Sequence, residues 1–255
     1  HYPLRRQRQM CIRDSHIDAS CSWDFRYEAK GQITGFGKTP CNDKVIMIFS
    51  YDTVKFPFEK ITQSYLGCDD LTLAHKNSPF EQTLAEGTDQ AQLLHKKFYN
   101  SMDTDSKQRF ATIYRQFVSE VIFSFYREPI LFQRFPTFRV HQPSNIAVFK
   151  WHRDRDFNHH PKTVNYFLPV TKAFGTNTFW YQKNNNEESY VPMELDCGQV
   201  AQWDGANCRH GNKTNKTNQT RISFDFRVLK EKDYDPLTIH KSITQSMTFK
   251  IGEYY

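Results

Sequence analysis

The fold is decided by residues 220–229, which read Thr220-Arg221-Ile222-Ser223-Phe224-Asp225-Phe226-Arg227-Val228-Leu229. Polar and apolar side chains alternate along this stretch, as they do in a β-strand, where successive residues point to opposite faces. One face would carry four polar side chains: Arg221, Ser223, Asp225 and Arg227. Burying such a face is costly unless it finds partners, so the stretch predicts a strand whose polar side looks into a polar cavity.

Other short segments share the length and the β-branched or aromatic content of strands. In the second half of the chain they cover residues 137–141, 146–151, 163–170, 178–182, 199–203 and 247–251, and residues 45–49 form an earlier one. Clusters of Pro, Gly and Asn separate many of them. This pattern predicts a mainly β fold with flanking α-helices, whose core is a double-stranded β-helix of the jelly-roll, cupin-like kind.

Two helices are predicted between the strand at residues 45–49 and the later strands. Residues 89–101 place Ala91, Leu94 and Phe98 on one side. A longer amphipathic helix of about 20 residues follows an N-capping cluster at residues 103–106, with apolar side chains at steps of three and four. It must end before Pro129, since the residue preceding a proline disfavours helix. Its apolar side is expected to pack on a sheet.

The length of 255 residues and the 22 phenylalanines suit one domain with a substantial core. We expect residues 16–255 to form a single domain, in which a helical and mixed part (16–135) precedes the jelly-roll core (136–255). Residues 1–15 resemble an expression or sequence-assembly remnant and are expected to be non-native.

The formal net charge is +6, which raises the question of nucleic-acid binding. The first 15 residues carry half of it, through Arg5, Arg6, Arg8 and Arg13 against Asp14. The remaining +3 is modest and argues against a nucleic-acid partner.

No apolar run approaches the roughly 20 residues that a membrane-spanning helix needs, so no membrane partner is expected. Six cysteines lack the close spacing of a zinc or disulfide motif, and no secretory signal is evident. These features predict reduced thiols and a cytoplasmic location.

A candidate metal site begins at Trp151-His152-Arg153-Asp154. Because it follows a predicted strand, His152 and Asp154 would point to the same side. His210 lies 58 residues after His152 and supplies a third ligand. Two imidazoles and one carboxylate, with open positions left for a co-substrate and O2, are what a non-haem Fe(II) site requires.

The alternative is that these three residues are unrelated and that the polar face of residues 220–229 meets water. His-x-Asp is a weak signal by itself, since His16-Ile17-Asp18 repeats it. Arg221, 11 residues after His210, favours the metal site. A guanidinium pairs bidentately with a carboxylate, and the Ser223 hydroxyl would add a donor, so both are expected to hold the far carboxylate of 2-oxoglutarate.

The order of the motifs in residues 136–229 resembles the StrG-type branch of the 2-oxoglutarate/Fe(II)-dependent dioxygenases, which is related to the phytanoyl-CoA hydroxylase group. The resemblance is carried by Phe138-Arg139-Val140, Trp151-His152-Arg153-Asp154, Asn165-Tyr166-Phe167-Leu168-Pro169-Val170-Thr171, Phe174-Gly175-Thr176-Asn177-Thr178, Cys208-Arg209-His210-Gly211-Asn212 and Thr220-Arg221-Ile222-Ser223-Phe224-Asp225-Phe226-Arg227.

The resemblance implies iron ligands at His152, Asp154 and His210, and a 2-oxoglutarate anchor at Arg221 and Ser223. It implies an enzyme that uses O2 to hydroxylate or otherwise oxidise a small polar metabolite (an amino acid, sugar or natural-product intermediate), with release of succinate and CO2. The family's Tyr-Gly-His after the first ligands is replaced by Phe157-Asn158-His159-His160. The roles of His159 and His160 therefore stay open.

Two further residues lie on strands expected beside the site. Asn165 and Arg139 could donate to 2-oxoglutarate or to substrate, or could be satisfied polar residues of the barrel interior. The oligomeric state, the substrate and the choice between hydroxylation, desaturation and demethylation are not determined by the sequence.

Two other functions compete with this one. An AlkB-like nucleic-acid demethylase also carries two arginines six residues apart, like Arg221 and Arg227, but the modest charge argues against it. A non-catalytic cupin-like barrel would have no need of three metal ligands and Arg221 together.

Overall fold

The computed structural model describes residues 46–83, 92–148, 150–183, 189–237, 241 and 247–255, together with the backbone of residues 12–13, 16–17, 40–41 and 44–45. Two antiparallel sheets dominate it. The main sheet has the order β1 (Ile12–Arg13), β2 (His16–Ile17), β6 (Ile130–Phe132), β13 (Arg221–Lys230), β8 (Val164–Pro169), β11 (Gln199–Trp203) and β5 (Met47–Ser50), with β7 (Thr137–His141) also paired to β13. The small sheet has the order β10 (Tyr190–Pro192), β9 (Phe179–Gln182) and β12 (His210–Asn212). A further pair is formed by β3 (Pro40–Cys41) and β4 (Lys44–Val45).

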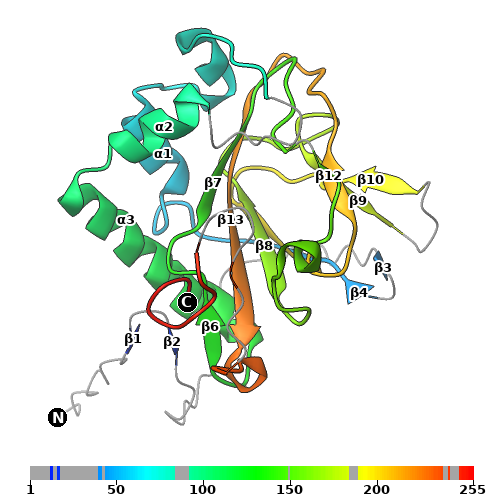
Figure 1. Cartoon of the computed structure of the whole chain (residues 1–255). Coiled ribbons are helices and arrows are strands. Elements are labelled where there is room, and N and C mark those ends of the chain that lie inside the picture. Colours follow the sequence, from blue (N-terminus) through cyan, green and yellow to red (C-terminus); the bar gives the residue numbers. More distant parts are fainter. Residues whose placement is uncertain are drawn as a thin grey trace, which may run out of the picture.

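The two sheets enclose a cavity, since residues of both line it. Helices cover the other side of the main sheet, and β9, β10 and β12 lie opposite them (Figure 1). This is the arrangement of a jelly-roll core with flanking helices, so the predicted fold class is confirmed.

Strand β13 is the centre of the main sheet. Its first half pairs with β7, its last residues pair with β6, and its other edge pairs with β8. Ile222, Phe224, Phe226 and Val228 are buried in the apolar core, whereas Arg221, Asp225 and Arg227 line the cavity. The alternation of residues 220–229 therefore predicts the two sides of this strand correctly.

The helices are α1 (Phe58–Leu66), α2 (Leu93–Asn100) and α3 (Thr104–Phe117). The predicted long helix is confirmed: the Asp103 side chain accepts a hydrogen bond from the backbone N–H of Ser106 at 2.7 Å and caps it. After α3 the chain continues as a π-helical turn, η3 (Val118–Ile122), and a 3-10 turn, η4 (Phe123–Phe125). Leu94 and Phe98 of α2 are buried as expected, and Ala91 lies outside the described residues. Helix α1 and the 3-10 helix η1 (Leu71–Asn77) were not predicted.

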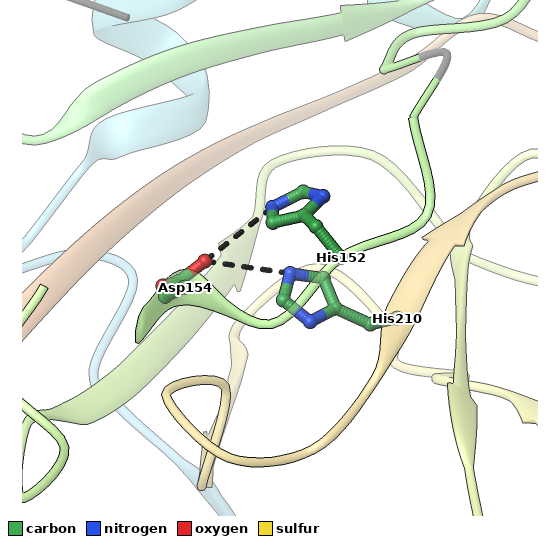
Figure 2. Close-up of side chains that lie close together, drawn as sticks. All are labelled: His152, Asp154 and His210. Atoms are coloured by element: carbon green, nitrogen blue, oxygen red, sulfur yellow. Dashed lines mark ion pairs between the residues drawn. The ribbon is translucent and has the colours of Figure 1, made fainter. Parts of the chain in front are cut away.

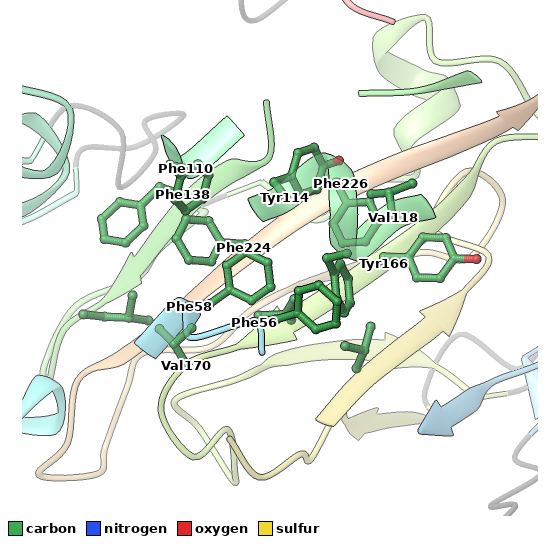
Figure 3. Packing of buried hydrophobic residues seen from close by; sticks show 14 of the residues in the cluster. Phe56, Phe58, Phe110, Tyr114, Val118, Phe138, Tyr166, Val170, Phe224 and Phe226 are labelled. Atoms are coloured by element: carbon green, nitrogen blue, oxygen red, sulfur yellow. The ribbon is translucent and has the colours of Figure 1, made fainter. Parts of the chain in front are cut away.

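Aromatic rings fill the space between the helices and β13 (Figure 3). Phe224 lies at the centre of this layer, with its ring centroid 5.2 Å from that of Phe110 and 5.6 Å from that of Phe138. Phe58 and Phe98 complete its surroundings at 6.0 and 5.7 Å. The packing fixes one face of β13, and with it the direction in which the opposite, polar face points.

Two predicted strands are wrong. Residues 146–148 and 150–151 form no strand, because backbone N–H groups there bond to side chains instead: Ile146 donates to Asn145 Oδ1 and Val148 to Asn212 Oδ1. Residues 247–251 lead into a turn closed by bonds from the backbone N–H groups of residues 253–255 to the Lys250 carbonyl, with Gly252 at a φ of 87°. Strands β6, β10 and β12 were not predicted.

Cys68 and Cys197 carry free thiols, whereas Cys208 is disulfide-bonded, so the expectation of reduced cysteines is wrong at Cys208. Among the described residues, every helix is too short or too polar to cross a membrane.

Replacing Phe224 by alanine is expected to lower the free energy of unfolding by about 3–5 kcal/mol, because it opens a cavity among rings that cannot collapse fully. The matched control is Phe80→Ala, whose side chain is 57% exposed and should change stability by less than about 0.5 kcal/mol. Chemical denaturation of both variants measures the difference. Equal effects would contradict the central place given to Phe224.

Candidate metal centre

His152, Asp154 and His210 come together at one end of the cavity. Their ligand atoms all lie within 4.8 Å of one another. One oxygen of Asp154, Oδ1, lies 3.5 Å from Nε2 of His152 and 3.6 Å from Nε2 of His210. Figure 2 shows this oxygen directed at both imidazole rings.

The backbone places the two histidines opposite each other. His152 and His210 form an isolated antiparallel bridge, in which each N–H donates to the other's carbonyl at 2.9 Å. Asp154 begins a 3-10 helix, η5 (Asp154–Phe157), and its N–H donates to the Gly205 carbonyl at 3.0 Å. The three side chains converge through this bridge and turn, and not through the strand that was predicted over residues 146–151.

Hydrogen bonds also fix which nitrogen of each histidine faces the centre. Nδ1 of His152 lies 2.8 Å from the Lys150 carbonyl, and Nδ1 of His210 lies 2.9 Å from the Cys208 carbonyl. A carbonyl only accepts, so each Nδ1 carries a proton, and Nε2 is the nitrogen that each ring directs at the centre. Such bonds from the outer nitrogen are typical of metal-binding histidines.

The second oxygen of Asp154 is held from the other side. Oδ2 accepts hydrogen bonds from Nε of Arg227 at 2.7 Å and from Nδ2 of Asn165 at 2.6 Å. Asp154 is 2% exposed. Because both contacts fall on Oδ2, the other oxygen is left facing the two imidazoles.

The charges of the site follow from burial and from these pairs. Burial would raise the pKa of Asp154, but Arg227, followed by His152, His210 and His159, outweighs it and holds this pKa well below its ordinary value. Burial, and then His152, lowers the pKa of His210 to about 4. At neutral pH the centre therefore contains an ionised carboxylate and a neutral His210, the protonation states that a metal ion requires of its ligands.

Two glycines allow close packing around these residues. A Cβ on Gly205 would lie 2.5 Å from the side-chain amide of Asn165, and a Cβ on Gly211 would lie 2.5 Å from the Trp151 ring. Gly205 thus leaves room for the amide that holds Asp154. Gly211 lets Trp151 lie against the strand that carries His210.

Arg221 and Ser223, the predicted carboxylate anchor, lie in the same barrel. Arg221 is 3% exposed and lines the cavity together with the three convergent residues. Its Nε donates to the Asn177 carbonyl at 3.1 Å and its Nη1 to Ser223 Oγ at 2.9 Å. The Ser223 hydroxyl in turn points to Asp225, at 3.4 Å. In this arrangement Ser223 orients Arg221, while Arg221 reaches the cavity.

The other candidates from the sequence have different surroundings. Arg139 lines the cavity and forms an ion pair with Asp225, with 3.5 Å between Nε and Oδ2. Asn165 uses its N–H donor on Asp154, and its Oδ1 is buried without a hydrogen-bond partner among the described residues.

His159 is more enclosed than a solvated loop histidine would be: its ring centroid lies 4.4 Å from that of Phe249, and burial followed by Arg227 lowers its pKa to about 3. His160 accepts a hydrogen bond from the Lys162 backbone N–H at 3.2 Å. Neither histidine belongs to the convergent group.

Arg227 is the residue whose contact with Asp154 the sequence did not indicate. The sequence placed it on the polar face of residues 220–229, as the second of two arginines six residues apart. The alternation that places it on the polar face with Arg221 was a usable signal. Its partner, Asp154, lies 73 residues away, and no local pattern could have identified it.

Fold and site together define a class: an antiparallel double-stranded β-helix protein with two histidines and one aspartate converging in its cavity. No protein-family model matches the sequence. The streptomycin biosynthesis protein StrG of Streptomyces griseus is 36% identical over 205 residues, which cover 80% of this chain and 94% of StrG. The chain therefore belongs to the StrG family.

Two solved structures show a weaker likeness. A non-heme monooxygenase, ThoJ in complex with nickel, is 14% identical, with 71% of each chain covered and a TM-score of 0.41. AviO1 of Streptomyces viridochromogenes is also 14% identical, with 73% of this chain and 90% of AviO1 covered and a TM-score of 0.41. At such scores neither structure bears on the activity of this chain.

Replacing His210 by alanine removes one of the three convergent atoms. We expect Co(II) to bind more than about 100-fold more weakly to this variant. Losing even a residue that only hydrogen-bonds to a metal ligand typically lowers metal affinity about 10- to 100-fold. Calorimetric titration of the apoprotein measures the change. His160→Ala is the control and should bind Co(II) like the wild type; a similar loss in both variants would refute the assignment.

Proposed function

We propose that this protein is a non-haem Fe(II)- and 2-oxoglutarate-dependent oxygenase that oxidises a small polar metabolite. The observation that carries the proposal is the convergence of two imidazole Nε2 atoms and one carboxylate oxygen in a cavity that also contains the buried Arg221. Membership of the StrG family supports it, since the relative's name places StrG in the biosynthesis of a natural product.

The donor set fits Fe(II). Two imidazoles and one carboxylate form the facial arrangement of non-haem iron oxygenases, which leaves coordination positions for other ligands. Asp154 is restricted to a single binding oxygen, because Oδ2 is occupied by Arg227 and Asn165. His152 and His210 are held in the correct tautomer by backbone carbonyls.

The cavity also fits a dicarboxylate. Arg221 is a buried guanidinium whose orientation is set by the Asn177 carbonyl and Ser223. Guanidinium groups pair with carboxylates more strongly in such dry surroundings than in water. Arg139 is the weaker candidate for this role, because Asp225 already balances its charge.

When bound, iron and 2-oxoglutarate would supply the oxidising chemistry: O2 is consumed, one oxygen atom enters the product, and 2-oxoglutarate leaves as succinate and CO2. The residues of the chain would bind and orient the metal and 2-oxoglutarate. His152, Asp154 and His210 would position the metal, and Arg221 with Ser223 would position the far carboxylate. The apolar cavity wall, which includes Phe167, Phe179 and Trp203, would exclude water.

The substrate is proposed to be an amino acid, a sugar or another natural-product intermediate. Hydroxylation is the simplest outcome. A relation to the phytanoyl-CoA hydroxylase group and a single domain over residues 16–255 belong to the same proposal. The disulfide at Cys208 removes the argument from reduced thiols for a cytoplasmic location.

Anaerobic mixing with Fe(II) and 2-oxoglutarate tests the function directly. We expect a visible charge-transfer absorption, which His210→Ala should abolish, and O2-dependent succinate release stimulated by small polar metabolites. A colourless mixture, unchanged by His210→Ala, would favour a non-catalytic barrel. Stimulation by methylated oligonucleotides alone would favour a nucleic-acid demethylase.

Arg221→Ala separates co-substrate binding from metal binding. We expect the affinity for 2-oxoglutarate to fall about 10- to 1,000-fold, as for the loss of a buried charged hydrogen bond, while the Co(II) affinity stays within about threefold of the wild type. Titrations of Co(II), and then of 2-oxoglutarate into the Co(II)-loaded protein, measure both. Arg155→Ala, at an exposed site, is the control. Equal losses for metal and 2-oxoglutarate would show that Arg221 is structural only.

A further inference from the structure

The C-terminal segment, residues 247–255, lies against Arg227 and His159, beside the candidate metal centre. Its rings are buried: Phe249 is 8% exposed, and Tyr254 and Tyr255 are each 2% exposed. They pack with Leu131 of β6 and Leu229 of β13 in a small core of their own. In Figure 1 this segment forms the red loop beside β6.

A chain of hydrogen bonds connects this segment to the metal ligand Asp154. Nη1 of Arg227 donates to the Tyr254 hydroxyl at 3.5 Å, and Nε of the same arginine donates to Asp154 Oδ2 at 2.7 Å. The Tyr254 hydroxyl donates to Gln133 Oε1 at 2.9 Å. One guanidinium is therefore held by Tyr254 on one side and itself holds Asp154 on the other.

Gln133, at the end of this chain of hydrogen bonds, is itself fixed by several hydrogen bonds. Its backbone N–H donates to the Arg227 carbonyl at 2.9 Å, and its side-chain Nε2 donates to the Phe135 carbonyl and to Thr137 Oγ1. The backbone N–H of Arg134 donates to the Tyr254 carbonyl at 2.8 Å. Both ends of Tyr254 are thus tied to the residues that follow β6.

A second route runs through His159. Its ring lies against Phe249 and, at 5.9 Å, against Tyr254, and its backbone N–H donates to the Asp154 carbonyl at 3.3 Å. Segment 247–255 therefore covers both Arg227 and the turn that carries Asp154. By excluding water it strengthens the buried Arg227–Asp154 pair, because charges attract more strongly in a medium of low dielectric constant.

We propose that residues 247–255 stabilise the metal centre, and that Tyr254 is a positioning residue that sets metal affinity through Arg227. This inference rests on the proposed metal site. It assigns a role to a segment far in sequence from the ligands, and it predicts that docking of the segment and binding of the metal favour each other, since such coupling is reciprocal.

Tyr254→Phe tests the proposal with the smallest change, since it keeps the ring packing and removes only the hydroxyl. We expect the Kd for Co(II) to rise about 3- to 10-fold, which is less than the roughly 10- to 100-fold typical of a direct partner of a ligand because Tyr254 lies one step further out. Tyr255→Phe is the matched control: it removes a hydroxyl from the same buried segment, and it should leave the Kd within about twofold of the wild type.

A double-mutant cycle distinguishes positioning from general packing. Arg227→Lys keeps a positive charge beside Asp154 but cannot hold Asp154 and Tyr254 with one planar group. If Tyr254 acts through Arg227, adding Tyr254→Phe to Arg227→Lys should change the Kd for Co(II) by less than about 1.5-fold. Full additivity of the two effects would overturn the proposed route.

Amide hydrogen exchange gives a readout that does not depend on any variant. Co(II) should slow exchange at residues 253–255 of the wild-type protein. Three results would contradict the proposal: unchanged exchange in this segment, an unchanged Kd in Tyr254→Phe, or equal losses in Tyr254→Phe and Tyr255→Phe. If the wild-type protein binds no Co(II), the proposed metal site is wrong, and this inference is wrong with it. If the wild-type protein binds Co(II) and Tyr254→Phe binds it with the same Kd, the inference alone is wrong.

Discussion

The balance of charge around the buried carboxylate of Asp154 is the constraint on which the site depends. An ionised carboxylate in a barrel interior is strongly destabilising unless it is paired and hydrogen-bonded. Arg227 and Asn165 satisfy Oδ2. The other oxygen faces Nε2 of both imidazoles, at 3.5 and 3.6 Å. Such a set of donor atoms suits a cation.

Strand β13 connects this centre to the rest of the molecule. Its apolar side is locked by aromatic rings beneath the helices, and its polar side presents Arg221 and Arg227 to the cavity. Arg227 binds the carboxylate of Asp154, and Arg221 is the residue that we propose to bind the co-substrate carboxylate. Because core residues make the strand rigid, the two guanidinium groups keep a fixed spacing. Precision at the site is thus a consequence of packing on the opposite face.

Secondary structure could be predicted from the sequence wherever a regular spacing of apolar residues determines it. The two-residue alternation of residues 220–229 gave the correct faces of β13, and the steps of three and four gave α3 with its Asp103 cap. The convergence of His152 with Asp154 was predicted for a wrong reason, since a single bridge and a 3-10 turn create it. Helix α1, nine residues between Pro57 and Gly67, was missed.

The contacts that complete the site could not have been predicted, because they join residues far apart in the chain. Arg227 meets Asp154 across 73 positions, and Tyr254 meets Gln133 across 121. Long-range pairs of this kind follow from the packing of the two sheets and leave no periodic pattern in the sequence. The hydrogen bond from Asn165 to Asp154 could not be predicted either, because it depends on the space left by Gly205.

Anomalous diffraction at the iron edge, from crystals grown without oxygen in the presence of Fe(II), tests the central claim most directly. We expect a single strong peak bounded by Nε2 of His152, Nε2 of His210 and Oδ1 of Asp154, with Arg227 still on Oδ2. A peak elsewhere, or no peak at these three atoms at full Fe(II) loading, would contradict it.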